Sequence, residues 1–78
     1  MTNVKEIRIL EAAQMYYEES MFLFKQYQES QGTDLEEILW AACEEKSGKA
    51  DGLLFAYEIL TGIKLYQHQI KEHIMQVA

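Results

Sequence analysis

Residues 30–36 read Ser30-Gln31-Gly32-Thr33-Asp34-Leu35-Glu36, and this segment carries the signals for a helix end and a helix start. Gly32 suits the left-handed conformation with which many helices end. The spacing of Thr33 and Glu36 matches a capping box, in which two side chains bond the free N–H groups at a helix start. One helix is therefore expected to end here and another to begin within a few residues.

Upstream of this turn, apolar side chains recur at the spacing of an amphipathic helix from residue 4 to about residue 30. On a helical wheel they fill one broad arc that covers roughly half of the circumference. Three apolar residues fall outside the arc, among Arg and Glu side chains. They form a narrow second line that is unexpected on a face that meets only water: Val4, Met15 and Phe22.

Downstream of the turn, glycines divide the rest of the chain into two further helices. A short amphipathic helix is predicted over residues 34–46. The following segment, 47–52, contains Gly48 and Gly52 and little apolar surface, and Asp51 is placed to cap a long final helix over residues 52–76. Within that helix, Gly62 is expected to permit close approach of a neighbouring helix, since an interior glycine otherwise costs about 1 kcal/mol. The alternative is a tolerated surface glycine.

The predicted fold class is all-α, with residues 1–78 forming a single helical domain, because a chain this short supports one domain at most. The first and last helices would form a long antiparallel hairpin, with the short middle helix along one side. Their apolar arcs are wider than one neighbouring helix can bury. The sequence therefore predicts a homodimer with a four-helix-bundle-like core, and a monomeric three-helix bundle is the alternative.

The predicted dimer interface draws on apolar positions of the two long helices. Its residues are Ile9, Tyr16, Leu23, Tyr27, Ile59, Ile63, Ile70 and Ile74.

Composition and charge narrow the possible partners. Thirteen acidic against seven basic residues leave a net charge of −6, which repels nucleic-acid backbones and anionic membranes. No apolar stretch approaches the ~20 residues that span a bilayer, and the first residues are too charged for a secretory signal. Cys43 is the only cysteine, which fits a reducing compartment. We expect a cytoplasmic protein that binds neither nucleic acid nor membrane directly, and in which Cys43 is a small buried hydrophobe.

The sequence offers little for catalysis. His68 and His73 lie about 140° apart around a helix, so they cannot coordinate the same metal ion without further ligands. The Glu-x-x-His motif of carboxylate-bridged metal bundles is absent, although Glu18, Glu19 and Glu58 could point inward in a dimer. No phosphate-binding glycine loop occurs, and a catalytic nucleophile with its base usually depends on loops that this chain hardly has. We expect no enzyme and no cofactor, and a metal-binding helical bundle is kept as an alternative.

Trp40 is the most informative single residue. The wheel places it off the apolar stripe of its helix, beside acidic side chains, where a tryptophan is a candidate anchor for a protein partner. The alternative is that Trp40 packs against a long helix or the second subunit. For Phe22 and Met15, too, the side chain could be an exposed anchor for a partner or could pack within the protein. These three residues form the predicted partner-binding site of a non-enzymatic, regulatory interaction protein.

Acidic pairs suggest one further alternative. They would let the protein imitate a phosphate backbone and inhibit a nucleic-acid-binding target, although acidic faces usually serve only solubility. The pairs are Glu18-Glu19, Glu36-Glu37 and Glu44-Glu45.

Overall fold

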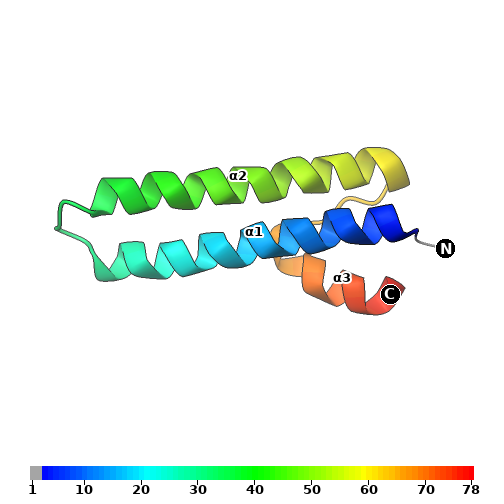
Figure 1. Cartoon of the computed structure of the whole chain (residues 1–78), viewed down its shortest axis with the longest axis horizontal. Helices are drawn as coiled ribbons and strands as arrows, with labels where there is room; N and C mark the ends of the chain where they lie inside the picture. Colours follow the sequence, from blue (N-terminus) through cyan, green and yellow to red (C-terminus); the bar gives the residue numbers. More distant parts are fainter. Residues whose placement is uncertain (1–2) are drawn as a thin grey trace.

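The computed structural model describes residues 3–78 and consists of two long helices and a short C-terminal one. Helices α1 (Val4–Glu29) and α2 (Glu36–Thr61) pack side by side as an antiparallel hairpin (Figure 1). A 3₁₀ turn, η1 (Gln67–Gln69), leads into α3 (Ile70–Val77), which lies along the half of α1 that contains the N-terminus (Figure 1). The predicted all-α class with a long antiparallel hairpin is confirmed, but the partner of the first helix is the helix that directly follows the turn and not the predicted C-terminal helix over 52–76.

The break after the first helix forms where the sequence predicts it, and it joins the two long helices. Helix α1 begins with a capping box, because Asn3 accepts a hydrogen bond from the Glu6 N–H and Glu6 accepts one from the Asn3 N–H. It ends at Ser30, and Gly32 follows with φ +85°, in the left-handed region. The predicted Thr33 capping box is not formed. Thr33 Oγ1 accepts from the Leu35 N–H at 3.3 Å, and the Glu36 carboxylate accepts from the Gly32 N–H at 3.0 Å.

The prediction of a short middle helix over 34–46 is wrong, because α2 continues without interruption through residues 47–52. Asp51 does not cap a helix; its carboxylate accepts a hydrogen bond of 2.7 Å from Gln67 Nε2. Two interior glycines cost about 1 kcal/mol each in helix propensity. That cost is outweighed because Ala50, Leu54 and Tyr57 are buried on the face of α2 that packs on the rest of the chain.

The predicted long helix over 52–76 is also wrong, because Gly62 ends α2. Gly62 has φ +77° and donates its N–H to the Glu58 carbonyl at 2.7 Å. It is a left-handed helix terminus and not a point of close helix approach, since no side chain or backbone lies near the position of its missing Cβ. The chain then runs extended before η1 and returns as α3.

The core lies where α3 covers the hairpin. Its buried members come from all three helices: Leu10, Ala13, Leu54, Tyr57 and Ile70. In the part of the hairpin nearer the turn, the helices are joined instead by smaller contacts, such as the hydrogen bond of 3.3 Å from the Cys43 thiol to the Ser20 carbonyl. The molecule is elongated, with extents of 49 × 20 × 16 Å. One short third helix therefore leaves much of the hairpin surface uncovered.

Candidate interaction surfaces

Two of the predicted partner-binding residues lie together on α1. Met15 is 49% exposed and Phe22 62% exposed. With Leu23 they form the apolar part of an open hollow of about 450 Å³, whose polar rim is Glu18, Glu19 and Lys46. The apolar line outside the main arc of α1 is thus exposed, which answers the question that the sequence left open for Met15 and Phe22.

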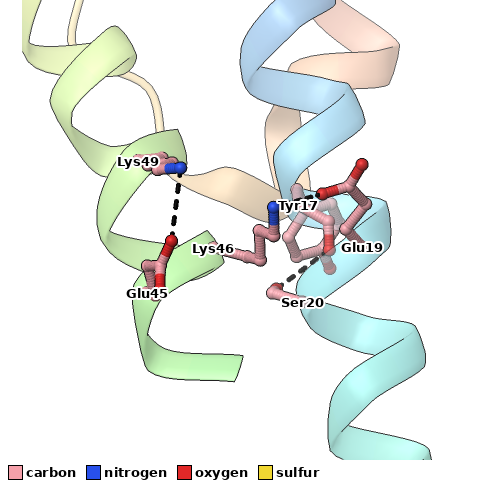
Figure 2. Close-up of polar contacts among 6 residues, drawn as sticks. All are labelled: Tyr17, Glu19, Ser20, Glu45, Lys46 and Lys49. Atoms are coloured by element: carbon pink, nitrogen blue, oxygen red, sulfur yellow. Dashed lines mark hydrogen bonds and ion pairs between the residues drawn. The ribbon is translucent and has the colours of Figure 1, made fainter. Parts of the chain in front are cut away.

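An ion pair joins the two long helices at the rim of this hollow. Lys46 Nζ lies 3.2 Å from a Glu19 carboxylate oxygen, and Lys49 pairs with Glu45 on its own helix at 3.3 Å (Figure 2). Both ammonium groups also lie over the ring of Tyr16, at 5.5 and 5.4 Å from its centre. The hydrogen bond and charge of Glu19 raise the pKa of Lys46, so the lysine of this ion pair stays protonated. Beside it, the Ser20 hydroxyl donates to the Tyr17 carbonyl within α1 (Figure 2).

Trp40 packs against aromatic residues of α1 but remains partly exposed to solvent. Its ring lies 5.1 Å from that of Tyr27 and 6.5 Å from that of Phe24, and these contacts join α2 to α1 near the turn. The side chain nevertheless remains 43% exposed. Together with Tyr27, it lines a second hollow whose other walls are Glu36 and Glu37. An aromatic surface with an acidic border is therefore present at the turn end of the hairpin.

The predicted dimer-interface residues fall into three groups. Ile59 and Ile63 are exposed, whereas Ile70 is fully buried in the core of the single chain and is unavailable to a partner, because the break at Gly62 turns it inward on α3. The others are partly buried within the chain: Ile9, Tyr16, Leu23, Tyr27 and Ile74.

A further apolar surface runs along the outer face of α2, and sequence reasoning missed it by dividing this helix at residues 47–52. Seven exposed positions follow one another at alternating steps of three and four residues. We call them the α2 seam: Ile38, Ala41, Glu45, Gly48, Gly52, Phe55 and Ile59. Its three large apolar members are 65%, 63% and 69% exposed, in chain order. The seven-residue spacing is the missed signal, because it becomes visible only when the helix is read as continuous.

The histidines and the cysteine take structural roles. His73 Nε2 shares a hydrogen bond of 3.0 Å with the Tyr57 hydroxyl, while the His68 ring stacks on Tyr66, with ring centres 6.3 Å apart. Within residues 3–78, no three His, Cys, Asp or Glu side chains are grouped so as to hold a metal ion. Burial, and secondarily the charge of Glu44, raises the pKa of Cys43, which keeps the thiol protonated and poorly nucleophilic.

Several of the carboxylates in the acidic pairs have partners within the chain. Glu19 and Glu45 pair with lysines, and Glu36 bonds the backbone of the turn.

Along residues 3–78, no helix has the length and apolar character needed to cross a membrane. Comparisons with protein-family models, curated proteins and solved structures gave no match.

Proposed function

We propose that this chain is a small, acidic, non-enzymatic protein that acts as a helical homodimer and binds and regulates another protein. The observation that carries the proposal is the distribution of large apolar side chains. Among the described residues, thirteen large hydrophobic side chains are exposed, whereas six hydrophobic residues are buried. Scattered surface hydrophobes are ordinary, but an excess in contiguous rows is typical of interaction surfaces.

The dimensions of the chain support association. A compact monomer of 9.1 kDa exposes about 4,900 Å², whereas this chain exposes 5582 Å². The excess of about 700 Å² is close to the ~800 Å² that each partner contributes to a standard interface. The radius of gyration, 14.3 Å, likewise exceeds the ~11.5 Å of a compact domain of this length. Association would cover the surface that the open hairpin leaves in water.

The regulated partner would bind at the hollow of Met15 and Phe22 and at Trp40. Exposed aromatic and methionine side chains beside charged groups have the composition of binding hot spots, which combine an apolar centre with a polar rim. Glu18, Glu19 and Lys46 supply such a rim around Met15 and Phe22.

Two measurements test the proposal separately. Sedimentation equilibrium should give about twice the chain mass of 9.1 kDa, and a concentration-independent monomer would overturn the dimer.

Partner binding is tested by using the wild-type protein, Phe22→Ala, Trp40→Ala and Met75→Ala as baits in native cell extract. The proteins that each bait retains are identified by mass spectrometry. Phe22→Ala and Trp40→Ala should lose a protein that the wild type retains, while Met75→Ala, a matched change on exposed α3 surface, should keep it. Retention of every bound protein by Phe22→Ala and Trp40→Ala would contradict the assigned surface.

A further inference from the structure

We infer that the α2 seam is the surface on which a second copy of this chain docks, with the two α2 helices parallel. The inference rests on the proposed homodimer and specifies its interface and orientation. The side of α2 that faces away from α1 and α3 is open (Figure 1), and every member of the seam is exposed. Six of its seven positions are apolar or glycine. A helix face of this composition is unusual in water and typical of helix pairing.

The glycines of the seam have no role inside the single chain. A Cβ built on Gly48 or Gly52 would meet nothing within 4 Å, and neither glycine has positive φ. In a lone helix each glycine costs about 1 kcal/mol relative to alanine without any compensating contact. A second helix would supply that contact, because glycine lets two helix backbones approach closely and leaves space for Phe55 of the opposing chain.

The charges beside the seam select the orientation. Along one edge, acidic residues recur every seven positions, and along the other edge lie Ala42, Lys49 and Ala56. The acidic edge consists of Glu37, Glu44, Asp51 and Glu58. Antiparallel helices would set the acidic edge against its own copy, which is repulsive. In a parallel pair, the acidic edge of each helix lies against the edge of Ala42, Lys49 and Ala56 on the other helix. Glu44 of one chain then lies beside Lys49 of the second copy, five residues further along the sequence, which is the offset between facing edge residues in coiled coils.

Intrachain contacts leave most of the acidic edge free, whereas Lys49 already pairs with Glu45 of its own helix and would have to share its charge with Glu44 of the second copy. Asp51 is already bonded to Gln67, whereas no ion pair involves Glu37, Glu44 or Glu58 among residues 3–78. Glu45 is the one charged member of the seam, and in a parallel pair it faces its own copy. Lys49 of the same chain, at 3.3 Å, partly offsets that repulsion. A single charged residue in a helix seam weakens association but fixes the register.

Disulfide trapping tests both the face and the orientation. Each variant carries Cys43→Ser and one new cysteine, either Gly52→Cys or Ile59→Cys, with exposed Met75→Cys on α3 as the control. After mild oxidation at a concentration where sedimentation shows dimer, Gly52→Cys and Ile59→Cys should form covalent dimers much faster than Met75→Cys. In an antiparallel pair, the steps of three and four residues match only if residue 59 lies opposite residue 41, and only a mixture of Ala41→Cys and Ile59→Cys chains would crosslink.

The outcomes separate the two claims. If the protein is dimeric but neither Gly52→Cys nor Ile59→Cys crosslinks faster than the control, this inference is wrong and the homodimer stands. If crosslinking occurs only in the mixture, the face is right and the parallel orientation is wrong. A monomer at all concentrations would remove both the inference and the homodimer.

As a check that needs no cysteine, Ile59→Asp should weaken association by at least about tenfold, because it places a charge in the seam. An unchanged association constant in a folded Ile59→Asp protein would overturn the assignment of the face.

Discussion

The Tyr57 hydroxyl lies 3.0 Å from His73 Nε2, and this hydrogen bond joins α2 to α3. The two rings also meet edge to face, with centres 5.8 Å apart. Tyr57 is almost fully buried, and α3 is too short to be stable without tertiary contacts. The pair therefore stabilises the docking of α3 on the hairpin.

Replacing Tyr57 with phenylalanine should lower the free energy of unfolding by about 1 kcal/mol, the usual net value of one hydrogen bond, with more if His73 is left unsatisfied. Urea denaturation followed by circular dichroism measures the change. Tyr66→Phe removes an equivalent hydroxyl from an exposed ring and should be neutral. Equal effects of the two substitutions would contradict a specific role for the Tyr57–His73 contact.

The same tyrosine should make the protein sensitive to alkali. Burial, and then the negative charge of Glu6, raises the pKa of Tyr57. The folded state therefore holds this proton more tightly than the unfolded state, whose tyrosines titrate near about 10. The stabilisation is fully present below that pH and is lost as pH rises through the folded-state pKa.

Unfolding free energies measured in urea at a series of pH values from about 8 to 11 should therefore fall more steeply for the wild type than for Tyr57→Phe. Parallel curves for the two proteins would show that other groups cause the alkaline loss.

Glycine-to-alanine substitutions should have opposite effects at two kinds of position. Gly62 has φ +77°, where a Cβ is strained, so Gly62→Ala should destabilise the fold by about 1 kcal/mol. Gly48 and Gly52 have ordinary helical backbones and empty surroundings, so alanine at either should stabilise the single chain by up to ~1 kcal/mol. Thermal unfolding at a concentration too low for association measures whether each substitution raises or lowers the stability of the single chain. Loss of stability in Gly48→Ala would mean that its surroundings are more crowded than the structure indicates.

The sequence predicts the break after the first helix because the information for this break is local. The helix end at residue 30 and the left-handed Gly32 depend on backbone chemistry within a few residues, and both are observed. Helical periodicity also places Met15 and Phe22 outside the main apolar arc, but their exposure is established by the structure.

The second half of the chain could not be predicted in this way, because its glycines look alike in the sequence but have different structural roles. Gly48 and Gly52 weaken α2 without ending it, since Ala50 and Leu54 are buried on its other face, whereas Gly62 ends it. Only tertiary burial distinguishes these glycines, and a single sequence does not reveal it. The misplaced break hid the α2 seam and placed Ile70 in the predicted dimer interface, whereas it belongs to the core of the single chain.

The α2 seam also predicts that two neighbouring glutamates affect association in opposite directions. In the parallel pair, Glu45 faces its own copy, while Glu44 meets Lys49 of the second copy. Glu45→Gln should therefore tighten association and Glu44→Gln should weaken it, each by several-fold, although both remove one negative charge. Sedimentation equilibrium at low salt measures both constants, and the difference should shrink as added salt screens the charges. If both variants tightened association equally, the effect would be a general relief of the net charge of −6 and would argue against specific pairing across the seam.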